Sequence, residues 1–281
     1  MKTRINKKIP ETKGPVPTQK ELPPKVTMDV HHVILVLSGK GGVGKSTVST
    51  NLASALAGHG RQVGLLDLDI HGPSIPTMLG IENHHPTVFG RTIEPVRVTG
   101  NLAVMSMGFL LPDASSPVIW RGPMKMAAIR QFLEDVNWGA LDYLIVDLPP
   151  GTGDEALTIA QLAPGVKGAV IVTTPQDVAV IDAKKAVKFI EKLGLPVIGI
   201  IENMSGMVCP HCGGTIDLFG RGGGEKAAAD LHVPYLGAIP IDPAMVKAGD
   251  EGRPYVLRHA DTPAWKAFGA IMENLEKRVE S

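Results

Sequence analysis

The stretch GKGGVGKS, residues 39–46, follows the apolar run VILVLS (33–38) and opens a segment with helical spacing, residues 45–58. It fits the pattern GxxxxGK[ST], whose glycines let backbone N–H groups approach phosphates without a clash at Cβ. A helix that begins there directs the positive end of its dipole at the same phosphates. We expect Lys45 to reach the β- and γ-phosphates of a nucleotide and the Ser46 hydroxyl to bind Mg²⁺. The nucleotide-binding residues predicted for this loop are Gly39, Lys40, Gly41, Gly42, Val43, Gly44, Lys45, Ser46 and Thr47.

Short β-branched runs alternate with helical segments along the rest of the chain. Continuous apolar strands between helices predict a parallel sheet that is buried on both faces. The fold class is therefore α/β: a single P-loop NTPase domain with a mostly parallel sheet covered by helices on both faces. The further strands are expected at residues 62–69, 101–107, 142–149, 168–174, 196–203 and 234–240, and the further helices at residues 122–136 and 178–193.

Two segments stand apart from this alternation. Residues 1–30 are rich in Lys and Pro and lack apolar periodicity, so we expect a flexible tail before a domain that covers residues 31–281. The run VCPHCGGTIDLFG (208–220) interrupts the pattern and indicates a small CxxC loop or hairpin inserted at about 206–220. The last segment, residues 262–279, places its apolar residues on one helical stripe, which we expect to pack against the sheet.

Bulk properties exclude several classes of protein. Lys and Arg total 28, as do Asp and Glu, so the net charge is zero and no nucleic-acid partner is expected. Two cysteines in 281 residues are too few for a disulfide scaffold. No apolar run approaches the ~20 residues of a membrane span, and no signal-peptide pattern is visible. We expect a cytoplasmic protein without a membrane partner.

Acidic residues end two of the expected strands. Asp147 closes YLIVD (143–147) and is the predicted second ligand of Mg²⁺, beside Ser46. Asp67 and Asp69 end the strand VGLLDLD (63–69), where a separation of two residues would point both side chains to the same face. We expect Asp69 to orient or deprotonate the attacking water, with a role near Mg²⁺ as the alternative for either residue.

Several motifs together resemble one family. KGGVGKST (40–47), DLDIHGPS (67–74), VIWRGPMK (118–125), the strand ending in Asp147 and the run around the two cysteines are similar to the Mrp/ApbC group of P-loop ATPases. These are iron–sulfur cluster carriers, related to MinD, ParA and the nitrogenase iron protein. The resemblance covers about residues 31–281 and implies slow ATP hydrolysis by a protein that acts as a carrier.

The resemblance also assigns roles to further residues. It implies that Lys40 crosses to the nucleotide of a partner subunit, so that a homodimer completes the catalytic set of Lys40, Lys45 and Asp69. A lysine supplied in trans would add positive charge where charge develops in phosphoryl transfer. The resemblance places Asn203 at the adenine ring, and Pro240 and Asp242 at the base pocket.

Cys209 and Cys212 form a CPxCG turn of the kind that ligates zinc or iron. Two thiolates fill half of a four-ligand site, which leaves three hypotheses: a zinc site completed by histidines, a redox dithiol, or a cluster shared across a twofold axis. With the resemblance, the leading hypothesis is a [4Fe-4S] cluster bound across a homodimer and transferred to apo iron–sulfur proteins. The alternatives are a MinD/ParA-like positioning ATPase with a zinc or idle CxxC, and a small-molecule ligase on the same fold.

Overall fold

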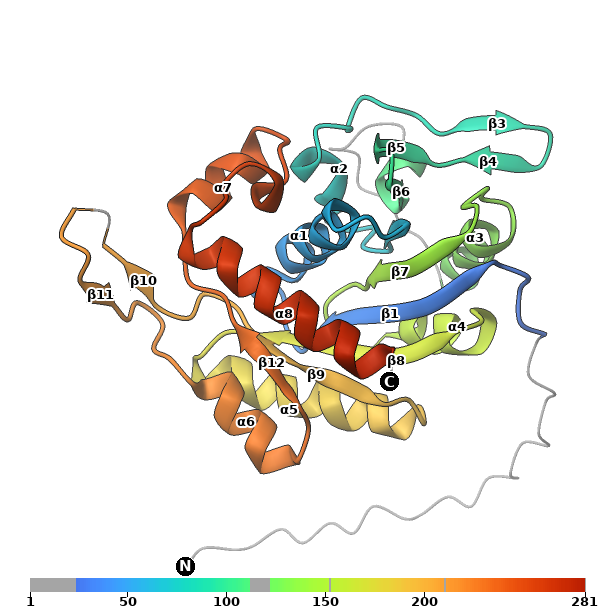
Figure 1. Ribbon diagram of the computed structural model, residues 1–281. Helices are drawn as coiled ribbons and strands as arrows, with labels where there is room; N and C mark the ends of the chain where they lie inside the picture. Colours follow the sequence, from blue (N-terminus) through green and yellow to red (C-terminus); the bar gives the residue numbers. More distant parts are fainter. Residues whose placement is uncertain (1–23, 112–121, 152, 210, 281) are drawn as a thin grey trace, which may run out of the picture.

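A central sheet organises this computed structural model, which describes residues 24–111, 122–151, 153–209 and 211–280. Within these residues eight strands form the sheet, and every neighbouring pair is parallel except the last, β6 and β5. The expected mostly parallel α/β sheet is therefore confirmed (Figure 1). In spatial order the strands are β12 (Tyr235–Ala238), β9 (Val197–Glu202), β8 (Val166–Thr173), β1 (Val30–Ser38), β7 (Leu141–Asp147), β2 (Val63–Asp67), β6 (Leu102–Ser106) and β5 (Val96–Thr99).

Helices cover both faces of the sheet, as the sequence predicts. One layer contains α3 (Gly122–Glu134), α4 (Asp154–Leu162), α5 (Asp177–Lys192) and α6 (Gly223–Leu231). The other contains α1 (Lys45–Gly58), α2 (Ile75–Met78), α7 (Pro243–Asp250) and α8 (Pro263–Val279), with the 3₁₀ turn η2 (Tyr255–Leu257). Alternate residues of β1 enter the two cores, because successive side chains of a strand point to opposite faces: Val33 and Leu35 on one side, Ile34 and Val36 on the other.

The C-terminal helix α8 buries its apolar stripe. Phe268, Ile271, Met272 and Leu275 are each at most 3% exposed and belong to the core beneath α1 and α8. Thr262 caps the start of this helix, and its hydroxyl accepts a hydrogen bond from the Trp265 backbone N–H at 3.1 Å. This confirms that the stripe packs against the sheet. In the described part of the chain no helix is long and apolar enough to cross a membrane.

The packed part of the chain begins before the boundary drawn from composition at residue 30. Val26 is buried, and its backbone N–H donates to the Leu162 carbonyl at 2.9 Å. A single apolar residue among Lys and Pro carries no periodicity, so this contact could not be predicted from the local pattern. Residues 1–23 of the expected tail, and 118–121 of the motif VIWRGPMK, lie outside the described residues.

Two features were not expected from the sequence. The antiparallel hairpin of β3 (Thr87–Phe89) and β4 (Thr92–Glu94) has strands of three residues, too short for an alternation to be recognised. The edge strand β5 pairs antiparallel with β6. Both lie away from the centre of the sheet.

At the centre of the sheet, β1 lies between β7 and β8. The connection from β1 leads to β2 on one side of β1, and the connection from β7 leads to β8 on the other side. The strand order therefore reverses direction at β1, which is the position where α/β proteins bind ligands.

Candidate functional site

The loop between β1 and α1 lies at the carboxyl edge of the sheet. Gly42 and Gly44 have φ angles of 78° and 79°, a left-handed conformation that favours glycine. Gly44 immediately precedes α1, and a Cβ there would lie 2.2 Å from Nδ2 of Asn203. The same amide donates to the Val43 carbonyl at 2.9 Å. Asn203, at the end of β9, therefore holds the loop by its backbone.

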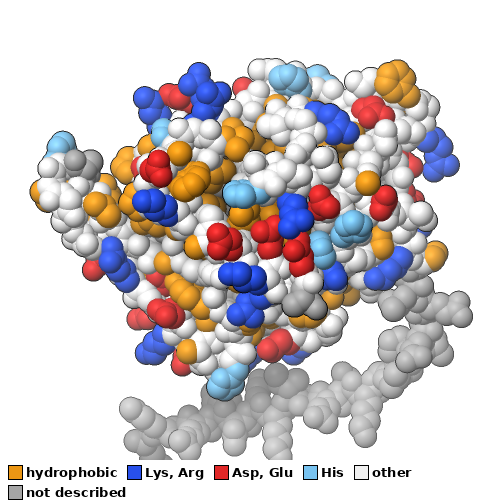
Figure 2. Space-filling view, viewed as in Figure 1, with side chains coloured by type: hydrophobic (Ala, Val, Ile, Leu, Met, Phe, Trp, Pro, Cys, Tyr) orange, Lys and Arg blue, Asp and Glu red, His pale blue; other side chains and the backbone are white. Residues whose placement is uncertain are grey.

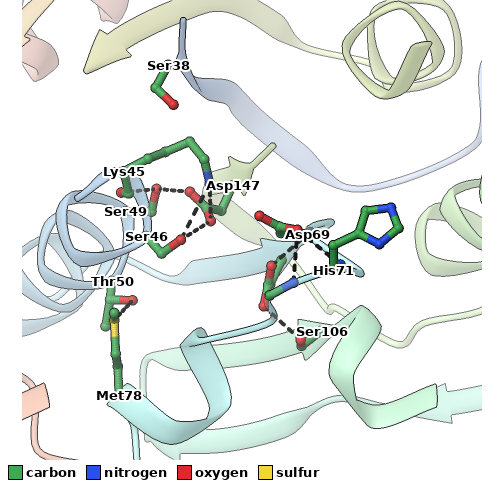
Figure 3. A network of polar contacts seen from close by, with 12 residues as sticks. Ser38, Lys45, Ser46, Ser49, Thr50, Asp69, His71, Met78, Ser106 and Asp147 are labelled. Atoms are coloured by element: carbon green, nitrogen blue, oxygen red, sulfur yellow. Dashed lines mark hydrogen bonds and ion pairs between the residues drawn. The ribbon is translucent and has the colours of Figure 1, made fainter. Parts of the chain in front are cut away.

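Asp147 is the centre of the polar contacts below the loop (Figure 3). Its carboxylate is fully buried at the end of β7 and accepts from Lys45 Nζ and Ser46 Oγ, each at 2.7 Å. Ser49 Oγ donates to the other carboxylate oxygen at 2.6 Å. The structure brings together Lys45, Ser46 and Asp147 as the sequence predicts. Ser49 was missed, although its position three residues after Ser46 puts both hydroxyls on one helical face.

A second buried carboxylate lies beside the first. Asp67 ends β2 directly opposite Asp147 in the strand register, and it accepts from Ser106 Oγ at 2.8 Å. Burial, followed by the charge of Asp147, raises the pKa of Asp67 to about 8. When Asp67 carries a proton, Asp147 is the one charged member of this pair of carboxyl groups, and the Lys45 ammonium balances its charge.

The expectation that Asp67 and Asp69 share a strand face was wrong. β2 ends at Asp67, and Asp69 lies in the following loop, where its backbone N–H donates to the Asp67 carboxylate at 3.0 Å. The half-buried Asp69 side chain accepts from the backbone N–H groups of His71 and Gly72 at 3.1 and 3.2 Å. Its carboxylate is therefore held at the sheet edge by its own loop (Figure 3).

A cavity of about 500 Å³ opens beside α1 and α7, within the size range of small-molecule sites. Four predicted residues line it: Thr47, Asn203, Pro240 and Asp242. The Asp242 carboxylate accepts from the Ala244 N–H at 2.8 Å, which caps α7, and from the Tyr255 hydroxyl. Asp242 thus shapes the cavity wall through contacts within the chain, a role that its motif did not reveal.

Lys40 differs from Lys45 in its surroundings. Its carbonyl accepts from Ser38 Oγ at 2.9 Å, which fixes the backbone, while the side chain is half-buried. Among the described residues the Lys40 ammonium has no hydrogen bond or ion pair, whereas Lys45 is paired with Asp147. The loop thus holds Lys45 against a buried carboxylate and leaves the Lys40 ammonium unpaired within the described ranges of the chain.

Cys209 and Cys212 lie between β10 (Met207–Val208) and β11 (Thr215–Ile216), which form an antiparallel hairpin that projects from the body (Figure 1). The Cys209 N–H donates to the Gly214 carbonyl at 2.8 Å, and the Gly213 N–H to the Cys209 carbonyl at 2.9 Å. Backbone N–H groups of Cys212 and His211 lower the pKa of the Cys209 thiol. In the part of the chain that is described, no three His, Cys, Asp or Glu side chains gather as a metal site.

A glycine loop on a helix N-terminus, a buried strand-end aspartate and a second loop lysine define a P-loop NTPase of the MinD and ParA class. The chain belongs to the family described as ParA: NUBPL iron-transfer P-loop NTPase, which it matches over residues 29–276.

Relatives of known name agree with this membership. An iron–sulfur cluster carrier protein of Methanocaldococcus jannaschii is 55% identical over 251 residues, 89% of this chain and 86% of that protein. The cytosolic Fe-S cluster assembly factor CFD1 of Eremothecium gossypii is 52% identical over 263 residues, which cover 90% of this chain and 94% of that protein. A nucleotide-binding protein of Archaeoglobus fulgidus, solved with ADP, matches this chain with a TM-score of 0.72 and 41% identity. The match covers 85% of this chain and 92% of that one. The cell division ATPase MinD of Pyrococcus furiosus matches with a TM-score of 0.63 and 26% identity, and the match covers 88% of this chain and 99% of that one.

Proposed function

We propose that this protein is an ATP-hydrolysing iron–sulfur cluster carrier, in which a homodimer binds one [4Fe-4S] cluster and transfers it to apo-proteins. The observation that carries the proposal is the half-site at Cys209 and Cys212. Within the described residues this pair of thiols has no third or fourth ligand from His, Cys, Asp or Glu. A twofold axis that joins two such pairs supplies the four thiolates of a cubane cluster. The names of the relatives support iron–sulfur cargo over zinc.

The nucleotide half of the proposal follows from the contacts of Asp147. Ser46 Oγ and the Asp147 carboxylate lie 2.7 Å apart, and both offer oxygen donors of the kind that Mg²⁺ prefers. The fit is good, and the bound ion would neutralise charge on the phosphates. Lys45 would exchange its ion pair with Asp147 for contacts to the β- and γ-phosphates, while backbone N–H groups of the loop hold their oxygens.

Hydrolysis then needs a positioned water and a cation in trans. Asp69 orients the water, whose oxygen bonds to the γ-phosphorus as the bond to the bridging oxygen breaks, giving ADP and phosphate. Lys40, whose ammonium has no partner among the described residues of its own chain, reaches the nucleotide of the partner subunit and stabilises the developing charge. Asn203, Pro240 and Asp242 surround the base.

Cluster transfer is an exchange of ligands without oxidation or reduction. Thiolates of the acceptor replace those of Cys209 and Cys212 on the iron ions, and the protein's thiolates take up the released protons. Cys212 is exposed and Cys209 half-buried on a projecting hairpin, so an acceptor can approach both sulfurs. An enclosed four-cysteine site would block this approach.

The test is anaerobic reconstitution with ferrous iron and sulfide, followed by chromatography and analysis of iron. We expect about one cluster per two chains, with its thiolate-to-iron absorbance, and loss of both in Cys209→Ala and Cys212→Ala. His211→Ala is the matched control on the same turn and should retain the cluster. A wild-type protein that binds ATP but stays colourless, or binds only zinc, would contradict the carrier role and favour a positioning ATPase.

A further inference from the structure

The cysteine loop, residues 206–220, contributes to the same cavity as the nucleotide loop. Met204 lies just before its start, Leu218 and Phe219 lie at its end, and all three line the cavity of about 500 Å³. Thr47 and Asn203 line it from the nucleotide loop side. A ligand in this cavity would therefore touch both ends of the segment that carries the cysteines.

Both ends of the cysteine loop are anchored to the end of β9 and its neighbours. At the start, the Ser205 N–H donates to the Ile239 carbonyl at 2.9 Å, and the Ile241 N–H donates to the Gly206 carbonyl at 2.8 Å. After the loop, the Gly222 N–H donates to the buried carboxylate of Glu202 at 2.9 Å. The anchored ends fix where the loop leaves the body, so its apolar end remains beside the cavity.

Leu218 is one of two strongly exposed apolar residues that line the cavity: it is 62% exposed, and Val246 on α7 is 66% exposed. Phe219 beside Leu218 is half-buried. Figure 2 shows hydrophobic side chains over α7 and the base of the projecting hairpin, the region that adjoins this cavity. An apolar leucine and an aromatic ring suit a flat heterocycle, since stacking on aromatic side chains tolerates any base. A phosphate or sugar would gain little from them.

We propose that Leu218 and Phe219 form one wall of the purine site, so that a bound nucleotide contacts the cysteine loop directly. This rests on the proposed nucleotide function and adds binding residues that the motifs did not supply. Only four residues lie between Met204 and Cys209, and five lie between Cys212 and Leu218. Nucleotide in the cavity therefore restrains both ends of the cysteine turn. Because coupling between two sites is reciprocal, occupancy of the cysteines changes nucleotide affinity by the same factor.

The first measurement is the affinity of the full-length protein for ADP by calorimetry. We expect Leu218→Ala and Phe219→Ala each to weaken ADP binding, by about ten-fold for Phe219→Ala. Val88→Ala and Phe89→Ala are matched controls, since these side chains are 61% and 67% exposed on the β3–β4 hairpin and do not line the cavity. The controls should bind ADP as the wild type does.

The second measurement uses the chain's only two thiols, those of Cys209 and Cys212, so that a thiol reagent reports on this loop alone. We expect saturating ADP to slow the reaction of the wild type about five-fold or more, and of Phe219→Ala distinctly less. Because Phe219→Ala retains the phosphate loop, a change caused only by phosphate binding or dimer formation would persist in it and overturn the proposal. If Leu218→Ala and Phe219→Ala bind ADP as tightly as the wild type, and ADP does not change the rate of the thiol reaction, this proposal is overturned while the nucleotide function stands. Failure of the wild type to bind ADP would overturn the nucleotide function as well.

Discussion

Removing the charge of Asp147 should expose how much the buried centre of the site contributes to stability. In Asp147→Asn the carboxamide keeps the shape of the side chain but cannot balance the Lys45 ammonium. Lys45 and Asp147 have side chains 7% and 0% exposed with a 2.7 Å contact, so the remaining cation has little access to water. Breaking a buried pair on one side costs about 3–5 kcal/mol, because a buried charge stays without a counterion.

Asp67 reduces this cost. Its pKa is raised in part by the charge of Asp147, so the substitution lets Asp67 ionise more readily and compensate Lys45. We therefore expect the lower end of the range, about 3 kcal/mol, which is roughly 6–12 °C in melting temperature for a domain of this size. The double variant Asp67→Asn/Asp147→Asn leaves no carboxylate beside Lys45. It should lose more stability than the two single changes added together.

The matched control for the Asp147 prediction is Asp230→Asn, which breaks a contact of the same 2.7 Å length to Lys184. That pair is exposed, with side chains 35% and 46% accessible, so solvent and salt screen it. Calorimetry or urea unfolding at low and high salt compares the variants. A loss in Asp147→Asn no greater than in Asp230→Asn, or one that disappears at high salt, would refute the assignment of Asp147 as a buried counterion.

Three further changes test other parts of the site. Because burial raises the pKa of Asp67 to about 8 from an ordinary 3.8, the native state binds more protons than the unfolded state between these values. Stability should then fall as pH rises through that window, by at most about 1.4 kcal/mol per pH unit, and Asp67→Asn should flatten the profile in urea unfolding. Lys40→Ala should lower the ATP hydrolysis rate about 10³-fold with ADP affinity unchanged; an equal loss of affinity would place Lys40 on its own chain's nucleotide. Gly42→Ala and Gly44→Ala share the left-handed φ cost of about 1–2 kcal/mol, but only Gly44→Ala also places a Cβ 2.2 Å from Asn203, so equal melting temperatures would contradict that packing.

Local motifs predicted the centre of the site because its geometry follows from short-range rules. The spacing of Lys45 and Ser46 in the loop, and a buried strand that ends in Asp147, suffice when parallel strands share one carboxyl edge. Ser49 and Leu218 were not predicted, because their positions depend on contacts between segments distant in sequence. Ser49 contacts a residue 98 positions away, and its spacing from Ser46 on the helix was the local signal that pointed to it. Asp69 shows the converse: alternation predicted a strand position, but the strand ends two residues earlier.

The end of β9 explains how one sheet edge can serve both the nucleotide loop and the cysteine loop. Glu202 is the last residue of β9, and Asn203 is the first residue after it. The buried Glu202 carboxylate accepts the N–H groups of Gly222 and Gly224, at 2.9 and 2.6 Å, which anchors the returning end of the cysteine loop. Asn203 donates to the Val43 carbonyl and so holds the nucleotide loop. Because Glu202 and Asn203 are adjacent in the chain, a shift of this strand end would move both loops at once. The strand end therefore sets where the two loops lie relative to one another, and the proposed contact of the nucleotide with Leu218 and Phe219 is what couples their occupancy.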